Sequence, residues 1–376
     1  MQNVFDAIFY VLSFLSVYVQ VFLLLTFLER KKDLLIRTEA IELPEYPPVS
    51  VVVPCYNEEK SVTGTVNSLL ALDYPAEKIS ILIVDDGSTD RTWEVMQEFK
   101  DHPQVKIFHK KNGGKHTALN FALERIETSY IGCLDADSAV HPQALKRIMS
   151  YFFADEHTMA VAPSIIVNNP KTIVQKAQKA DYDMAIYTKK MLGFLGGIHV
   201  TPGPFSIFRK KVFDDLGPYR KAHNTEDQEI ALRMQEHGYK IDHCPDAYVY
   251  TSSPDTIPKL YRQRLRWIYG FIKNAFDYRR MLFRRKYGHV AFFTIPSGII
   301  SIISVTFLLA FTGRNIWNFV SRKFVQYQTV GFEGLSLFSG AGFSFEWFFI
   351  SSRTIVFIGI LLYALVILSL LMGRSM

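Results

Sequence analysis

A long run of apolar residues near the start of the chain, at positions 4–28, limits what the chain can fold into. Asp6 and Gln20 are its main interruptions. About 20 apolar residues cross the roughly 30 Å hydrocarbon core of a bilayer, and backbone in lipid must satisfy its own hydrogen bonds, which favours a helix. No basic leader precedes the run, so we predict a retained transmembrane helix rather than a cleaved signal peptide.

Two later runs, at residues 292–312 and 354–372, predict further spans and a total of three transmembrane helices. An apolar content of 49% agrees with a chain that lies partly in lipid. Residues 343–350 are short and aromatic. They fit either an interfacial segment or an outward extension of the last span.

Two clusters of basic residues lie at the two ends of the segment between the first and second spans. Arg30, Lys31, Lys32 and Arg37 follow the first span, and Arg279, Arg280, Arg284, Arg285 and Lys286 precede the second. Cytoplasmic loops carry such an excess. We therefore predict an integral protein of the plasma (cell) membrane, with a cytoplasmic central segment and the N-terminus outside. Because this basic belt adjoins a lipid span, the net charge of +6 favours membrane lipids over nucleic acid as partner. Three widely spaced cysteines predict no disulfide framework and suit a reducing compartment.

Between the first two spans, strand-like and helix-like runs alternate. The strand-like runs are 49–54, 79–84, 105–109 and 130–134, and the helix-like runs are 60–72, 90–100 and 117–126. This alternation predicts an α/β domain with parallel strands covered by helices on both faces. Ligands of such sheets bind beyond the carboxyl ends of the strands, where the acidic motifs of this chain fall.

Asp85 and Asp86 end the second strand, where they could accept hydrogen bonds from the edge of a base and from ribose hydroxyls. The alternative is an ordinary Asp-Gly turn leading into a capped helix. Lys115 follows two glycines at a predicted helix start, which suits an anionic phosphate. A glycine turn with a solvated lysine would have the same sequence.

Asp135 and Asp137 close a strongly apolar strand, where ionised groups are costly unless they are paired or bound to metal. We predict that they hold a hard divalent cation that bridges to a diphosphate, in preference to a capping role.

Thr225, Glu226 and Asp227 begin a predicted helix that runs to about residue 237. An ordinary cap would explain this pattern. As chemistry, an inverting transfer needs a carboxylate that takes a proton from the attacking hydroxyl, and Asp227 is the candidate.

Gln263, Arg266 and Trp267 lie about one turn apart on a predicted helix at 258–281. Trp267 could stack on a sugar ring, and Arg266 could contact a diphosphate in a bidentate manner. The alternative is an interfacial amphipathic helix, and one helix can serve both purposes.

Together these motifs resemble glycosyltransferase family 2 and, within it, the cellulose, chitin and hyaluronan synthase branch. The resemblance spans roughly residues 48–270 and implies a GT-A (Rossmann-like) fold, a nucleotide-diphosphate sugar donor, Mg²⁺ or Mn²⁺, and inversion to a β-linkage. It is carried by Pro54-Cys55-Tyr56-Asn57-Glu58, Asp85-Asp86-Gly87-Ser88, Gly114-Lys115, Ala118-Leu119-Asn120, Asp135-Ala136-Asp137, Thr225-Glu226-Asp227 and Gln263-Arg264-Leu265-Arg266-Trp267.

By position, the resemblance implies donor contacts for Pro54, Tyr56, Glu58, Asp85, Asp86, Lys115, Asp135, Gln263, Arg266 and Trp267. It implies metal binding by Asp137 with Asp135, and a catalytic role for Asp227 with Glu226. Acceptor contacts fall to Trp267, Thr225 and Gly203. Gly203 lies in the turn Thr201-Pro202-Gly203-Pro204, where that branch usually has Cys or Ser.

These inferences predict a transmembrane helix at 1–30, a GT-A domain at 48–257, interfacial helices at 258–289 and two transmembrane helices at 290–376. Synthases that polymerise and export build a tunnel from more than three spans. We therefore predict hexose transfer to a lipid-linked or membrane-surface glycan acceptor, ahead of processive polysaccharide synthesis, for which an oligomer could supply the missing spans. Polyprenyl-phosphate sugar synthases come third, because they are not expected to carry the Gln-Xaa-Xaa-Arg-Trp element.

Two other classes of protein fit the sequence less well. A transport component would need ionisable residues along its spans, and these are lacking. An inactive nucleotide-sugar sensor would not need every carboxylate that a transferase uses, and all of them are present.

Overall fold

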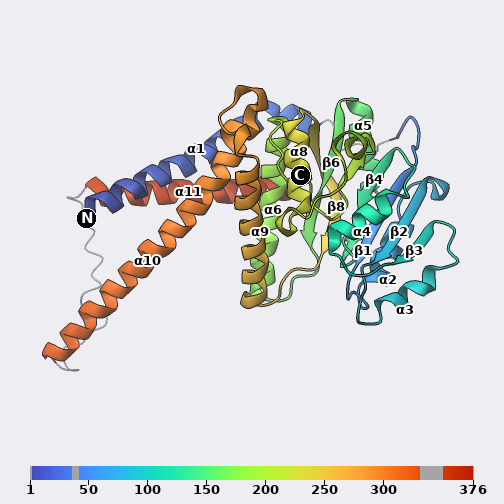
Figure 1. Cartoon of the computed structure of the whole chain (residues 1–376). Helices are drawn as coiled ribbons and strands as arrows, with labels where there is room; N and C mark the ends of the chain where they lie inside the picture. The colour runs from blue at the N-terminus through green and yellow to red at the C-terminus, as the bar shows by residue number, and fades with distance from the viewer. Residues whose placement is uncertain (1, 36–41, 331–349, 376) are drawn as a thin grey trace. The chain divides into compact units, whose positions relative to one another are not determined.

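The computed structural model describes residues 2–35, 42–330 and 350–375 (Figure 1). The chain divides into two compact units: residues 1–22 with 297–367, and residues 23–296 with 368–376. The second unit contains all the predicted site residues.

An eight-stranded mixed sheet, in the order β3-β2-β1-β4-β7-β6-β8-β5, forms the centre of the second unit. The strands are β1 Val49–Cys55, β2 Ile79–Asp85, β3 Val105–His109, β4 Tyr130–Cys133, β5 Ser138–Val140, β6 Thr158–Val167, β7 Ile207–Arg209 and β8 Lys240–Thr251. The four predicted strands are confirmed to within a residue at each end. They are parallel as expected, but β7 runs antiparallel to β4 and β6, and β5 antiparallel to β8, so the sheet as a whole is mixed.

The helices of this unit pack against the sheet through branched aliphatic side chains. Val51 and Val53 of β1 share one buried core with Val66 of α2 and Ile148 of α5. Burial of each such side chain contributes about 1.5–3 kcal/mol. The helices are α2 Val62–Leu70, α3 Thr92–Met96, α4 Lys115–Leu123, α5 Ala144–Ala154, α6 Ile173–Phe194, α7 Lys211–Leu216, α8 Glu226–Glu236 and α9 Ile257–Asp277.

The strand ends determine where the acidic motifs lie. β1, β2 and β4 are parallel neighbours that end at Cys55, Asp85 and Cys133. Their carboxyl ends therefore meet at one edge of the sheet, where ligands of α/β folds bind. The polar residues that follow each strand come from distant parts of the sequence and are brought to this edge.

Three long helices lie outside the sheet: α1 Gln2–Leu35, α10 Ile295–Val330 and α11 Ile350–Ser375. Among the described residues, only Ala7–Leu34 and Val290–Thr329 are long and apolar enough to cross a membrane. The predicted third span falls on α11, whose apolar part, Gly359–Ser375, is too short by the same criterion. The prediction of three transmembrane helices is therefore wrong, and the described part of the chain contains two long apolar helices.

The second apolar helix is much longer than the predicted span at 292–312. Its 40 residues correspond to about 60 Å at 1.5 Å per residue, twice the thickness of a hydrocarbon core. Of the proposed interfacial segment at 343–350, residues 343–349 lie outside the described part of the chain.

The end of α11 belongs to the same compact unit as the sheet. Arg374 Nε lies 3.1 Å from Asp183 of α6. The neighbouring Gly373 lies so close to the backbone carbonyl of Asp183 that a Cβ atom there would overlap it. A glycine at this position is what allows the two helices to approach.

Candidate active site

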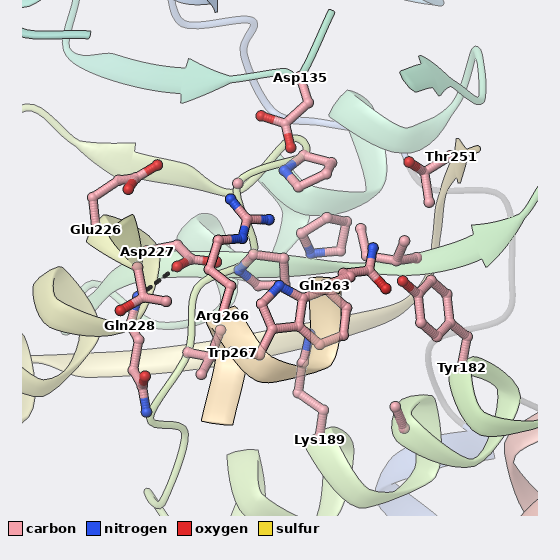
Figure 2. A pocket seen from close by; sticks show the side chains of 18 of the residues that line it. Asp135, Tyr182, Lys189, Glu226, Asp227, Gln228, Thr251, Gln263, Arg266 and Trp267 are labelled. Atoms are coloured by element: carbon pink, nitrogen blue, oxygen red, sulfur yellow. Dashed lines mark hydrogen bonds between the residues drawn. The ribbon is translucent and has the colours of Figure 1, made fainter. Parts of the chain in front are cut away.

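A cavity of about 530 Å³ brings together residues from the predicted motifs (Figure 2). Its size is typical of small-molecule sites. The predicted site residues that line it are Lys115, Asp135, Asp137, Gly203, Thr225, Glu226, Asp227, Gln263, Arg266 and Trp267. They come from the start of α4, the turn after β4, the loop before β7, the start of α8, and α9.

Lys115 and Asp135 form an ion pair at one end of the cavity, and Lys115 Nζ lies 3.6 Å from Glu226 Oε1. Burial alone would lower the pKa of Lys115, but Asp135 and Glu226 hold it well above its usual value. Gly203 lies directly against this pair, because a Cβ atom there would be 2.7 Å from Lys115 Nζ.

Asp137 is the carboxylate best suited to a cation. Asp137 is exposed, and its carboxylate accepts a hydrogen bond from the Ser138 hydroxyl at 3.1 Å. Partial desolvation by the surrounding protein, with the negative charges of Asp135 and Glu58, raises the pKa of Asp137 to about 6. A divalent cation would relieve this repulsion.

The donor set fits a cation that is shared with a ligand. No group of three or more His, Cys, Asp or Glu that could hold a metal occurs among the described residues. Asp137 and Asp135 would therefore supply only part of the oxygen ligands that Mg²⁺ or Mn²⁺ needs. Diphosphate oxygens and water commonly complete such a site.

Asp227 lies in the first turn of α8, and its position is fixed by its backbone. Its carbonyl oxygen accepts hydrogen bonds from the Thr201 N–H at 3.3 Å and the Thr201 hydroxyl at 2.9 Å, while its Oδ1 accepts from the Gln228 N–H at 2.9 Å. Burial and the adjacent Glu226 raise the pKa of Asp227 to about 6, although Lys115 opposes them. A carboxylate with a pKa near the working pH is suited to act as a general base.

Trp267 is held from one side by a neighbouring residue on α9. The Arg264 guanidinium lies 4.7 Å from the centroid of the indole ring and is 2.6 Å from Asp181 of α6. This cation–π contact occupies one face of the indole. The other face remains for a ligand in the cavity that Trp267 and Arg266 line (Figure 2).

Residues 50–217 match the family model described as glycosyl transferase family 2. The chain is also 30% identical over 275 residues to the poly-beta-1,6-N-acetyl-D-glucosamine synthase of Staphylococcus epidermidis, an alignment that covers 72% of this chain and 66% of the relative. The chain belongs to glycosyltransferase family 2. The enzyme of the same name from Staphylococcus aureus (strain COL) is 30% identical over 232 residues, with 61% of this chain and 56% of the relative covered. The chain thus spans just under two thirds of the first relative and little more than half of the second.

Among solved structures, a mannosyltransferase from Pyrobaculum calidifontis in complex with GDP-Man and Mn²⁺ has a TM-score of 0.64 at 18% identity. The alignment covers 97% of this chain and 99% of that one. This similarity shows a shared fold, a GT-A-like α/β domain with a mixed sheet.

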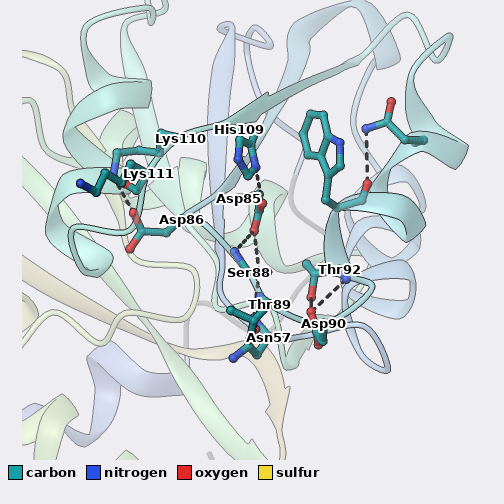
Figure 3. A network of polar contacts seen from close by, with 12 residues as sticks. Asn57, Asp85, Asp86, Ser88, Thr89, Asp90, Thr92, His109, Lys110 and Lys111 are labelled. Carbon is teal, nitrogen blue, oxygen red and sulfur yellow. Dashed lines mark hydrogen bonds and ion pairs between the residues drawn. The ribbon is translucent and has the colours of Figure 1, made fainter.

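Five residues predicted to contact the donor lie outside the lining of the cavity of this family 2 chain: Pro54, Tyr56, Glu58, Asp85 and Asp86. Asp85 and Asp86 are buried at the end of β2 (Figure 3). Asp85 accepts a hydrogen bond from Ser88 and lies 2.6 Å from His109 Nδ1. Tyr56 is about half exposed.

Asp86 fixes the glycine turn before Lys115. Its carboxylate accepts hydrogen bonds from the Gly113 and Gly114 N–H groups, at 3.1 and 2.8 Å. It also accepts one from Lys110 Nζ at 2.5 Å (Figure 3). Asp85 therefore takes part in the Asp-Gly turn that the sequence allowed, whereas Asp86 stabilises a different turn, the glycine turn before Lys115. Their contact with a nucleotide stays a prediction.

Thr225 occupies the predicted N-cap of α8, but its side chain makes no capping hydrogen bond. Its hydroxyl donates to the Ala222 carbonyl at 2.9 Å and accepts from Asn274 Nδ2 at 2.9 Å. The preceding turn is left-handed at three successive residues that are not glycine, with φ of 41° at Ala222, 57° at His223 and 63° at Asn224. Such residues rarely adopt this conformation, and His223 is held by Asp277 at 3.0 Å.

One face of α9 locks onto α8 through residues four apart. A Cβ atom on Gly270 would lie 2.9 Å from Thr225 Cβ and closer still to the rest of that side chain. Asn274 bonds to Thr225, and the Tyr278 hydroxyl donates to Glu229 at 2.7 Å. Sequence reasoning missed this face, although its spacing of four is the signal that could have shown it.

The opposite face of α9 is an exposed apolar stripe with helical spacing. It consists of Ile257, Tyr261, Leu265, Ile268, Ile272 and Phe276. The helix therefore has a feature that fits each sequence interpretation. One face lines the cavity and packs on α8, as a site helix would, and the opposite face is exposed and apolar, as an interfacial helix would be.

Proposed function

We propose that the protein is an inverting, metal-dependent glycosyltransferase that elongates a β-linked glycan at the membrane surface. The observation that carries the proposal is that Asp137, Asp227 and Trp267, from three separate motifs, line one cavity. The relatives are named as synthases of a polymer of N-acetyl-D-glucosamine. They favour polysaccharide synthesis over the single addition to a lipid-linked acceptor that the span count suggested.

In the proposed reaction, Asp227 removes the proton from the acceptor hydroxyl as that oxygen attacks the anomeric carbon of the donor sugar. The pKa of Asp227, about 6, leaves it ionised at neutral pH and still basic enough for this step. The Thr201 contacts to its backbone hold it in position. The nucleoside diphosphate leaves with the electron pair of the broken glycosidic bond.

Charge around the leaving diphosphate comes from side chains on two elements. Lys115 remains protonated because of Asp135 and Glu226, and Arg266 offers a guanidinium suited to bidentate contact. A divalent cation held by Asp137 and Asp135 would supply further neutralisation of the diphosphate. Gln263 and the open face of Trp267 would orient the sugars.

The membrane part of the proposal rests on two helices and one surface. α1 and α10 are long and apolar enough to span a bilayer. The exposed stripe of α9 precedes the basic residues Arg279, Arg280, Arg284 and Arg285, a combination suited to an anionic bilayer surface. We propose that the sheet lies on the cytoplasmic side and the N-terminus outside.

A donor panel tests the function. The purified full chain in detergent is given UDP-GlcNAc, UDP-glucose or GDP-mannose, with Mn²⁺, Mg²⁺ or chelator, and both nucleotide release and product length are measured. We expect metal-dependent release from UDP-GlcNAc and a ladder of products. GDP-mannose is included because the mannosyltransferase with the same fold was solved with GDP-Man. Turnover that survives chelation and Asp227→Asn would refute the proposal.

A further inference from the structure

One side of the cavity carries polar side chains that no motif accounts for. Lys189 lies on α6, His199 lies in the loop after α6, and His243 lies on β8. All three line the cavity together with Asp227 and Trp267. We call these three residues the Lys–His wall, and Figure 2 shows Lys189 rising from its helix toward Trp267.

The Lys–His wall contains buried polar atoms without partners. His199 Nδ1 and His243 Nε2 make no hydrogen bond, nor does Oε1 of the neighbouring Gln263. His243 is fully buried. Lys189 has no hydrogen bond or ion pair within the described residues. Unpaired buried polar groups cost about 1–3 kcal/mol each, so several on one cavity side indicate that a ligand supplies the missing partners.

The orphaned atoms differ in what they need. His243 Nδ1 lies 2.9 Å from the Ala162 carbonyl, which can only accept, so Nδ1 carries the proton. Burial and the nearby Lys189 keep this imidazole neutral by holding its pKa well below its usual value. His243 Nε2 is therefore an acceptor, as is Gln263 Oε1, whereas Lys189 is a donor.

The two unpaired acceptor atoms and the lysine donor distinguish between a phosphate and a sugar as the part of the acceptor substrate that binds here. A phosphate dianion would satisfy Lys189, but it has no proton to give to His243 or Gln263. A sugar presents hydroxyl groups that each donate and accept. Trp267 and Phe271, which also line the cavity, suit its apolar ring faces.

The loop that carries His199 is held firmly on both sides of it. The Gln235 side chain donates to the Ile198 carbonyl at 2.8 Å, and Thr201 is bonded to the backbone of Asp227. A group bound at His199 is therefore held at a fixed distance from the carboxylate that would accept its proton. This coupling is what an acceptor site needs.

We propose, building on the function above, that Lys189, His199 and His243 form a binding subsite for an uncharged sugar unit of the acceptor. Lys189 donates to a sugar oxygen, and His243 and Gln263 accept from sugar hydroxyls. None of the recognised motifs contains these three residues.

The test uses the full chain in detergent with UDP-GlcNAc as donor and two acceptor probes, a β-1,6-linked N-acetylglucosamine oligosaccharide and a polyprenyl phosphate. We expect the oligosaccharide to saturate transfer. Lys189→Met should raise the KM for the oligosaccharide about 10- to 100-fold, the worth of one hydrogen bond to a charged group, with less than a twofold change in the KM for the donor. Lys189→Arg should recover part of the loss.

Lys176→Met is the matched control, since Lys176 is exposed on the same helix and does not line the cavity. The Tm of Lys189→Met should equal or exceed that of the parent, because a half-buried, desolvated ammonium without an ion pair in the described part of the chain is removed, whereas a purely structural lysine would give a lower Tm. Saturation by the polyprenyl phosphate alone, or an unchanged oligosaccharide KM in Lys189→Met, would overturn the subsite. Absence of donor turnover in the parent chain would instead refute the proposed function.

Discussion

Gly270→Ala is the substitution for which the structure and simple helix propensity give opposite expectations. Alanine in a helix interior is favoured over glycine by about 1 kcal/mol. At position 270, however, the new Cβ would lie 2.9 Å from Thr225 Cβ, about 0.6 Å inside the shortest normal carbon–carbon contact. α9 or the Thr225 turn must therefore move, and Asp227 lies two residues beyond Thr225.

We expect Gly270→Ala to lower the Tm, because overpacking of this kind costs about 1–3 kcal/mol. Turnover should fall roughly 100-fold, as is typical for a displacement near 1 Å of a catalytic group. Gly64→Ala is the control, since Gly64 lies in α2 and a Cβ there meets nothing within 4 Å. Thermal unfolding and nucleotide release from UDP-GlcNAc measure both effects. A raised Tm with full turnover in Gly270→Ala would refute the described packing of α9 on Thr225.

Three further predictions concern the site, and a fourth concerns the membrane topology. Turnover should fall about tenfold per pH unit below about pH 6, where Asp227 becomes protonated, as a pH–rate profile will show. Asp227→Asn should abolish turnover yet raise the free energy of unfolding at neutral pH by ~1–2 kcal/mol. A carboxyl whose pKa is raised to about 6 in the folded state stabilises that state below its unfolded pKa, and this stabilisation is lost as the pH rises through 6. Equal stability of variant and parent at pH 7 would contradict this prediction. Asp137→Asn should weaken Mn²⁺ and donor binding together in a titration, and a selective loss of only one would argue against a shared cation. An impermeant thiol reagent in sealed membrane vesicles should reach Lys176→Cys only from the cytoplasmic side, while a tag at Gln328 reacts only from outside; the native Cys244 cannot report this because it is fully buried.

The elements predicted well from sequence are those in which local chemistry and the fold agree. Val105–His109 matches its predicted strand at both ends, because a short run with β-branched and aromatic residues between turn residues favours a strand and is too short for a stable helix. The motifs that meet in the cavity were predictable because they follow strand ends or start helices, and parallel strands place such residues at one edge.

The elements that were missed depend on tertiary contacts. α6 carries four lysines and only a weak apolar pattern, and its one clear signal is the capping box of Thr172 and Gln175. A third span was wrongly predicted at residues 354–372, because the length of an apolar run does not by itself separate a short apolar helix from one that spans the membrane. The Lys–His wall has no sequence signature, since an unpaired buried atom is a property of the folded chain only.

The left-handed turn at residues 222–224 has a consequence for assembly of the protein. Ala222, His223 and Asn224 hold a conformation that residues with a side chain seldom adopt, and they keep it only while the surrounding structure requires it. One contact that supports this turn is made by His223 Nε2, which lies 3.0 Å from Asp277 at the C-terminal end of α9. Asp277 is the last residue of α9, so we expect the turn, and with it the start of α8, to become ordered only once α9 has packed against the rest of the domain.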